Sequence, residues 1–320
     1  MIRRLITGVL GVVLGCHGYA VAQEAKYPVK PIRMGVGYAP GGGSDIMGRL
    51  IAPEITAALG QQVIVENRPG QAQNIAAEYF VKQPADGYTL FLSSAALGVN
   101  VSLYPKLNYD PVRDFVPIAV FATSANLLLA HPSLPARSVK EFIAIIKKNP
   151  GKLNYSSSGS GSTQHLSGEM LKLMIKGDFT HIPYKGTGPS LIALASGEVE
   201  FSFSNIPAAQ PLLSRMRVLA ITGEKRSALM PEVPTMIEAG LPGFVTQTWY
   251  GVLSPRGTPV SVITALNTVI VKAVQREDFR NRIAQMGADP IAESPEYFRK
   301  MLNEEIERWS KVIKASGIKP

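Results

Sequence analysis

Cysteine is almost absent from this chain of 320 residues, because Cys16 is the only one. It lies in an N-terminal segment with the layout of a secretory signal: a basic start, a short apolar run from Leu5 to Leu14, and the small-x-small pattern Ala20-Val21-Ala22. We expect export to remove residues 1–22, which leaves a mature protein without disulfides, a thiolate nucleophile or a cysteine-ligated metal. The alternative is a lipoprotein anchored at Cys16. The leucine before its glycine fits that signal poorly, so we favour the free periplasmic form.

Motifs of nucleotide binding and of catalysis are missing as well. No Gly-Lys-Ser or Gly-Lys-Thr ending of a phosphate loop occurs, and Pro40 stands where the dinucleotide pattern needs its third glycine. There is no G-x-S-x-G nucleophile elbow. His131, His165 and His181 show no spacing typical of metal ligands. We therefore expect no catalytic residue, no metal and no cofactor, and we expect that the protein is not an enzyme.

Charge is sparse and evenly spread. Charged residues make up 18% of the chain, and the formal net charge is +9. Lysines and arginines form no dense run and are not interleaved with aromatic residues, which argues against a nucleic-acid surface. No apolar run after the first residues is long enough to span a bilayer, so we expect a soluble mature protein. The length suggests about two domains.

Three consecutive glycines stand out near the start of the mature chain. Between an apolar segment at Ile32–Val36, expected to be a strand, and a helix near Ile46, the chain runs Gly37-Tyr38-Ala39-Pro40-Gly41-Gly42-Gly43-Ser44-Asp45. Three consecutive glycines leave their backbone amides uncovered, and the helix N-terminus adds partial positive charge. Such a place suits a small anion. We expect a loop that faces a ligand, and the plainer alternative is a tight turn that needs positive φ.

Strands and helices alternate along the chain, which predicts an α/β fold with parallel sheets covered by helices. A second alternation of strands and helices begins near residue 125. It repeats the order of strand, Gly/Ser loop and helix, with a strand at 153–156, a loop at Ser156–Thr163 and another helix. After Pro242-Gly243 the chain returns to the first unit. Two crossings, near residues 123–126 and 244–247, predict a hinge with a cleft between two lobes. We assign residues 23–125 and 246–320 to lobe 1, and residues 126–245 to lobe 2.

The candidate ligand-binding residues lie on loops at the carboxyl ends of predicted strands, where open α/β sheets bind ligands. In lobe 1 they are Tyr38, Pro40, Gly42, Gly43, Ser44, Asp45, Gln73, Asn74, Ser93 and Ser94. In lobe 2 they are Ser158, Ser160, Ser162, Thr163, His165, Tyr184, Lys185 and Asn205. Hydroxyls and free amides at two helix starts suit carboxylate groups, and Lys185 is the one cation expected near them. For any single side chain the alternative is a helix cap, a packing residue or a solvated surface group.

Several separated motifs are typical of one family. They are Tyr38-Ala39-Pro40-Gly41-Gly42-Gly43-Ser44-Asp45, Val65-Glu66-Asn67-Arg68-Pro69-Gly70, Asp86-Gly87-Tyr88-Thr89-Leu90, Asn149-Pro150-Gly151-Lys152-Leu153-Asn154-Tyr155, His165-Leu166, His181-Ile182-Pro183-Tyr184-Lys185-Gly186, Pro231-Glu232-Val233-Pro234-Thr235 and Trp249-Tyr250-Gly251. In this order they resemble the tripartite tricarboxylate transporter receptor family, the Bug-type periplasmic solute-binding proteins. The resemblance covers nearly all of the mature chain.

The resemblance implies a type II-like periplasmic-binding-protein fold, with two parallel-type sheets flanked by helices and a ligand cleft between two lobes. It implies that the Tyr38–Asp45 loop holds a carboxylate through backbone amides and ordered water, opposite the Ser158–Thr163 loop. Whether the ligand is a dicarboxylate, an amino acid or an aromatic acid stays open. The implied partner is a two-subunit membrane permease driven by an ion gradient. We expect a monomer with no nucleic-acid partner.

The sequence departs from the family in places. Gln71-Ala72-Gln73 stands where relatives usually have small residues, often glycines, and Gly37 replaces a common proline. Gln73, expected on the rim of the cleft, is therefore predicted to affect the choice of ligand. Two other functions stay open. One is a hydrolase or isomerase acting on a small carboxylate, against which the missing nucleophile–base pair counts. The other is a receptor that signals through a membrane sensor.

Overall fold

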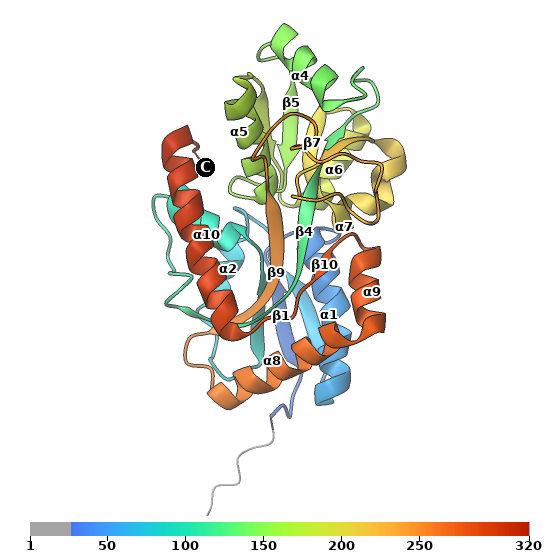
Figure 1. The fold of residues 1–320 in the computed structure, drawn as a ribbon. Coiled ribbons are helices and arrows are strands. Elements are labelled where there is room, and N and C mark those ends of the chain that lie inside the picture. The colour runs from blue at the N-terminus through green and yellow to red at the C-terminus, as the bar shows by residue number, and fades with distance from the viewer. Residues whose placement is uncertain (1–26, 320) are drawn as a thin grey trace, which may run out of the picture.

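The computed structural model describes residues 27–319, and the expected signal segment, residues 1–22, lies outside them. Within the described residues, ten strands form a curled, mixed sheet in the order β2-β1-β3-β9-β4-β7-β5-β6, with β8 and β10 each paired to β4. Figure 1 shows two lobes, each flanked by helices, with β4 and β9 running from one to the other. We call the part around β1–β3 the first lobe and the part around β5–β8 the second lobe. The predicted α/β fold class is confirmed.

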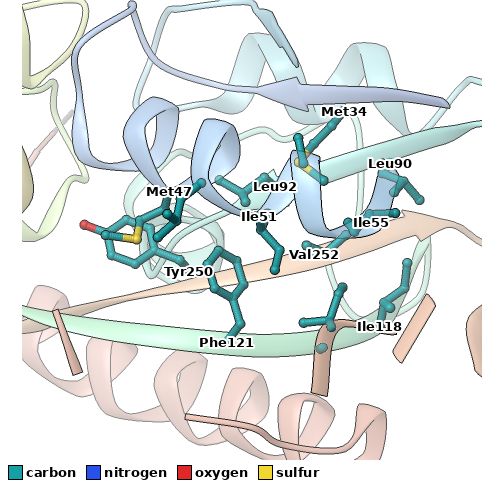
Figure 2. Close-up of a cluster of buried hydrophobic side chains, with 14 of the residues drawn as sticks. Met34, Met47, Ile51, Ile55, Leu90, Leu92, Ile118, Phe121, Tyr250 and Val252 are labelled. Carbon is teal, nitrogen blue, oxygen red and sulfur yellow. The ribbon is translucent and has the colours of Figure 1, made fainter. Parts of the chain in front are cut away.

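The first lobe is built on three parallel strands, β1 (Ile32–Val36), β2 (Val63–Asn67) and β3 (Thr89–Ser93). The helices that surround them are α1 (Gly43–Leu59), α2 (Asn74–Phe80), α3 (Ala96–Leu103), α8 (Val260–Gln275), α9 (Glu277–Gln285) and α10 (Pro295–Ser316). Helix α1 buries Met47, Ile51 and Ile55 against the sheet, as their spacing predicts. Figure 2 shows these side chains in one apolar cluster with Phe121 and Tyr250, which come from the two crossing strands.

The second lobe repeats the plan with β5 (Asn154–Ser157), β6 (Thr180–Pro183) and β7 (Phe201–Asn205), where β5 is parallel to both neighbours. Strand β8 (Arg217–Ile221) is antiparallel to β4. The helical elements are α4 (Val139–Lys148), α5 (Thr163–Ile175), α6 (Thr187–Ser196), the short α7 (Ile206–Ala209) and a 3₁₀ turn at Gln210–Arg215. A separate apolar cluster, which includes Phe142, Tyr155 and Phe201, fills this lobe.

Two long strands connect the lobes. Strand β4 (Phe115–Ala130) pairs with β9 (Gln247–Pro255) as far as Ala125, and from Asn126 onward it pairs with β7. The short β10 (Asp289–Pro290) also pairs with β4 in the first lobe. Nearly every residue of β4 is buried, and the strand continues without a break through residues 123–126, where the sequence predicts the first crossing between the lobes. These crossing strands run antiparallel to their neighbours, so each lobe has a mixed sheet instead of a purely parallel-type one.

The last helix, α10, packs along α3 and β4 of the first lobe. Near its end, Trp309 joins a small apolar cluster that also contains Leu166 of α5, so the helix reaches the second lobe. In the described part of the chain, no helix is both long and apolar enough to cross a membrane.

Candidate ligand-binding site

A small cavity lies where the two lobes meet. It is lined by Tyr38, Gly43, Ser44, Ser94, Ser158, Thr163, Gln164, Thr187, Asn205, Thr248 and Tyr250. These residues carry eight hydroxyls and two amides, and Gly43 contributes only backbone. Within residues 27–319, no acidic, basic or histidine side chain lines this cavity. The site is therefore polar and formally neutral.

The glycine loop forms the first-lobe wall. Helix α1 begins after Gly42, and Gly43 and Ser44 in its first turn line the cavity. Backbone amides in the first turn of a helix have no partner within the helix. Asp45 shapes this loop from behind: its carboxylate accepts hydrogen bonds from the Gly41 backbone N–H (3.0 Å), Arg49 Nε (3.0 Å) and Asn67 Nδ2 (2.9 Å). Gly41 has a φ of 78°, a conformation that favours glycine.

Two helix starts form the second-lobe wall. Ser162 caps α5 by accepting a hydrogen bond from the His165 backbone N–H (3.2 Å), and Thr163 and Gln164 in the first turn line the cavity. Helix α6 begins after Gly186, and its first residue, Thr187, also lines the cavity. With α1, three helix N-termini meet at one cavity. Each carries partial positive charge, so the neutral side chains surround a region of positive potential.

Two tyrosines reach the cavity from the core. Tyr38 and Tyr250 pack their rings into the apolar cluster of the first lobe, while their hydroxyls reach the cavity wall. The Tyr38 hydroxyl pairs with Ser94 Oγ at 3.3 Å. The Tyr250 hydroxyl is buried and, among the described residues, has no hydrogen-bond partner. Burial raises the pKa of both phenols well above the usual value, so both keep their protons and can donate to an anion.

A family model described as the tripartite tricarboxylate transporter family receptor matches residues 47–318 of this chain. The chain belongs to this receptor family. It is 36% identical to Protein BugT of Bordetella pertussis over 319 residues, which is 98% of each chain. The structure of R. palustris Rpa4515 with adipate matches with a TM-score of 0.90 and 39% identity, over 92% of this chain and 99% of that one. MatC from Rhodopseudomonas palustris with bound malate matches with a TM-score of 0.86 and 34% identity, over 90% and 100%.

Family membership makes this receptor a periplasmic solute-binding protein and confirms the resemblance stated from its motifs. Of the candidate site residues, seven line the cavity of the receptor: Tyr38, Gly43, Ser44, Ser94, Ser158, Thr163 and Asn205. They come from both predicted loops and from the ends of two strands, β3 and β7. The fold therefore brings the two Gly/Ser loops together across the cleft.

Eleven candidate residues do not line the receptor's cavity: Pro40, Gly42, Asp45, Gln73, Asn74, Ser93, Ser160, Ser162, His165, Tyr184 and Lys185. Most have structural partners instead. The Tyr184 hydroxyl donates to Glu198 (2.7 Å), Asn74 Oδ1 accepts from Tyr109 (2.6 Å), and the Lys185 carbonyl accepts from the Ala39 N–H (3.2 Å). The last contact joins the lobes through backbone, so Lys185 contributes its main chain rather than a cation.

Gln73 is fully buried behind the cavity wall instead of lying on the rim. Its amide donates to the Ser94 carbonyl (3.1 Å) and accepts from Ser93 Oγ (3.1 Å). Its Cβ also occupies the space beside Gly37, where a Cβ on Gly37 would meet it at 2.1 Å. The two departures from the family pattern are therefore sterically linked, because the side chain at 73 needs glycine at 37.

His165 lies on the far side of the second Gly/Ser loop. Its Nδ1 accepts from the Gly161 N–H (3.1 Å), and its ring stacks on His181 with 4.1 Å between centroids. His181 Nε2 is paired with Ser157 Oγ at 2.6 Å. Burial lowers the pKa of His165 to about 4, outweighing the Glu169 carboxylate 3.9 Å from its Nε2. Burial, and then the neighbouring His165, lower the pKa of His181 to about 2. The pair thus supports the loop in its neutral form.

Four lining residues were not among the sequence candidates: Gln164, Thr187, Thr248 and Tyr250. Gln164 follows the predicted Ser156–Thr163 loop, and Thr187 follows Gly186, and both lie in the first turn of a helix. The helix starts themselves were therefore a usable signal. Thr248 and Tyr250 lie on β9, and nothing local in the sequence indicates that this strand returns to the cavity.

Proposed function

We propose that this receptor captures a small carboxylate in the cavity between its lobes and delivers it to a two-subunit membrane permease. One observation carries the proposal: three helix N-termini converge on a buried, uncharged cavity in which the Tyr250 hydroxyl lacks a partner. Backbone amides at helix starts bind anions well. The adipate and malate held by the two similar structures support a carboxylate ligand.

Ligand capture is proposed to close the lobes about β4 and β9. In this proposal lobe 1 comprises residues 23–125 and 246–320, and lobe 2 comprises residues 126–245. The change of partner strand at Ala125 and Asn126 supports a hinge at that point. Small-angle scattering should give a smaller radius with bound ligand than without it. An unchanged radius at saturating ligand would argue against closure.

The mature receptor is proposed to be a free periplasmic monomer that starts at Gln23, with no cofactor and no nucleic-acid partner. The small-x-small pattern before Gln23 supports cleavage at that point. Intact-mass measurement of periplasmic material tests this start. A diacylglyceryl group on Cys16 would show that the protein is membrane-anchored instead.

A thermal-shift screen over dicarboxylates, amino acids and aromatic acids tests the proposed function, since a bound ligand raises the melting temperature by mass action. We expect at least one carboxylate to raise it in a saturable way and to be recovered chemically unchanged. No shift from any carboxylate would contradict the proposal. Conversion of the ligand during long incubation would indicate an enzyme rather than a receptor.

A further inference from the structure

Four polar side chains at the proposed hinge form one buried, hydrogen-bonded group, which we call the hinge cluster. They are Asn126 of β4, Ser167 of α5, Thr222 just after β8 and Thr246 just before β9, and each is fully buried. Asn126 and Thr246 lie on the two segments that cross between the lobes, at β4 and at the start of β9 (Figure 1). The four residues are not among those that line the cavity, so any effect they have on binding is indirect.

Thr222 ties the two crossing segments together. Its backbone N–H donates to the Asn126 carbonyl (2.8 Å), and its hydroxyl oxygen accepts from the Asn126 N–H (2.9 Å). Its hydroxyl donates to the Thr246 carbonyl (2.5 Å), and its carbonyl accepts from the Thr246 N–H (3.0 Å). One buried residue therefore fixes the spacing of both crossings, at the point where β4 changes its partner strand.

The remaining hydroxyls of the hinge cluster can donate in only one direction. Ser167 Oγ donates its single proton to the Thr163 carbonyl (2.7 Å), so it can only accept from its other neighbours. Asn126 Nδ2 donates to it (3.3 Å), and Thr246 Oγ1 lies 2.6 Å from it. Thr246 must therefore donate to Ser167. A directed chain of hydrogen bonds runs from the crossing segment at Thr246 through Ser167 to Thr163.

This chain ends on a peptide group of the cavity wall. Thr163 and Gln164 lie in the first turn of α5, and both line the cavity. The Thr163 carbonyl and the Gln164 N–H belong to the same planar peptide group, so a bond that holds the carbonyl also fixes the direction of the N–H. Backbone N–H groups in the first turn have no partner within the helix and are available to an anion. Ser167 thereby orients such a donor without touching the ligand.

Packing alone would not need this chemistry. Valine has nearly the shape of threonine, and burial of a hydroxyl costs free energy unless its hydrogen bonds are made. In the hinge cluster the bonds are made, and they connect Ser167 to Thr246 across 79 positions of sequence. A satisfied, buried polar network holds its members in one relative geometry.

We propose that Thr246 and Ser167 are positioning residues for ligand binding, which hold the start of α5 in a fixed relation to the two crossing segments. The inference rests on the proposed function, and it adds residues that act through the cavity wall rather than on the ligand. An anion bound at the start of α5 is thereby connected to Thr246 and Asn126, where the proposed closure takes place.

Hydrogen–deuterium exchange on the unliganded protein tests the positioning without any ligand. Thr246→Val keeps the shape and removes the bond to Ser167, so exchange in peptides that span residues 163–168 should become about threefold faster or more. Thr246→Ser keeps the hydroxyl and should restore the parent rate. Thr258→Val is the matched control, because buried Thr258 donates to the Pro255 carbonyl (2.8 Å) outside the hinge cluster. It should leave exchange at 163–168 unchanged.

Calorimetry with adipate and malate, the acids held by two similar structures, tests the effect on binding. Thr246→Val should weaken binding about three- to tenfold, as expected for one ordinary hydrogen bond. Thr246→Ser and Thr258→Val should bind like the parent. Ser167→Ala combined with Thr246→Val should bind no more weakly than the weaker single variant, because both changes remove the same link. If Thr246→Val fails to fold, judged by its melting curve, Ser167→Ala breaks the link from the other side.

Parent-like exchange at residues 163–168 in Thr246→Val would overturn the inference. An equal loss of affinity in Thr258→Val would also overturn it, because that would indicate a general loss of stability, and additive losses in the double variant would show that Thr246 does not act through Ser167. If the parent binds neither acid, calorimetry uses the carboxylate that the thermal-shift screen finds. Failure of every carboxylate would refute the proposed function, and the exchange experiment would still decide whether the two residues position α5.

Discussion

Gly43 is the point at which the smallest change should have the largest effect on binding. An alanine Cβ there would lie 2.4 Å from Asn205 Oδ1 of the second lobe and 2.5 Å from the Tyr250 hydroxyl of the first. Real Cβ atoms essentially never approach a neighbour within 3.0 Å, so each oxygen must retreat by about half an ångström. Because Asn205 Oδ1 caps α7 in the second lobe and Gly43 lies in the first, the added Cβ opposes the close approach of the two lobes at this point. The closed, liganded form is therefore destabilised more than the open form.

The expected loss follows from the hydrogen bonds that closure makes. A charge-assisted hydrogen bond to a carboxylate contributes roughly 1.5–3 kcal/mol. Losing one or two such bonds from the second lobe, about 3 kcal/mol, weakens binding on the order of a hundredfold. Calorimetry on Gly43→Ala with the tightest-binding acid measures this. The melting temperature without ligand should fall by only a few degrees, through the displaced Tyr250. Gly43→Asp should weaken binding further, because its charge repels the ligand.

Gly42→Ala is the matched control. It is the neighbouring residue, its φ of −78° suits any residue, and the nearest atom to an added Cβ is the Ala39 carbonyl oxygen at 3.4 Å. We expect its affinity to stay within a few-fold of the parent. A folded Gly43→Ala protein that binds as tightly as the parent would refute the close-approach argument, and the glycine loop would then be only a turn.

Three further changes test the rest of the site. Thr163→Ala removes a lining hydroxyl and should weaken binding tenfold to a hundredfold by calorimetry; unchanged affinity would place the ligand elsewhere. Gln73→Gly removes the hydrogen bond to the Ser94 carbonyl and should shift the ligand profile in a thermal-shift panel, whereas an identical profile would contradict this. Acidification from pH 7 to 4 should lower the free energy of unfolding, because the unfolded chain protonates His165 and His181 near pH 6.5 and the folded chain does so only near 4 and 2. A His181→Asn variant should flatten this slope in denaturant titrations, and an equally steep slope would show that other groups cause it.

Most of the fold could be predicted from local patterns. The strand at 32–36 and the two helices that follow the Gly/Ser loops are indicated by apolar spacing and by turn residues. The continuity of β4 could not be predicted, because the polar residue Ser124 within the apolar run looks like the end of a strand. In the structure Ser124 is buried and donates to backbone carbonyls, so the strand continues through it.

The site was predictable where the main chain defines it. Three glycines before a helix indicate exposed amides whatever the tertiary structure, and Gly43 lines the cavity as expected. The role of a side chain depends on the direction in which it points and on contacts with residues that are distant in the sequence. Lys185 precedes Gly186, whose φ of 146° turns the loop so that the lysine carbonyl meets the other lobe. Tyr250 is about two hundred residues from Gly43, and only the pairing of β9 between β3 and β4 brings the two together.

The three helix starts have a consequence for how such receptors diversify. Their attraction for acids resides in peptide dipoles, which no side-chain replacement can delete. Selection is therefore free to exchange hydroxyl and amide residues on the walls, such as Thr187 or Gln164, while the attraction for negative charge persists. A scaffold of this kind can pass from one nutrient to another by single steps.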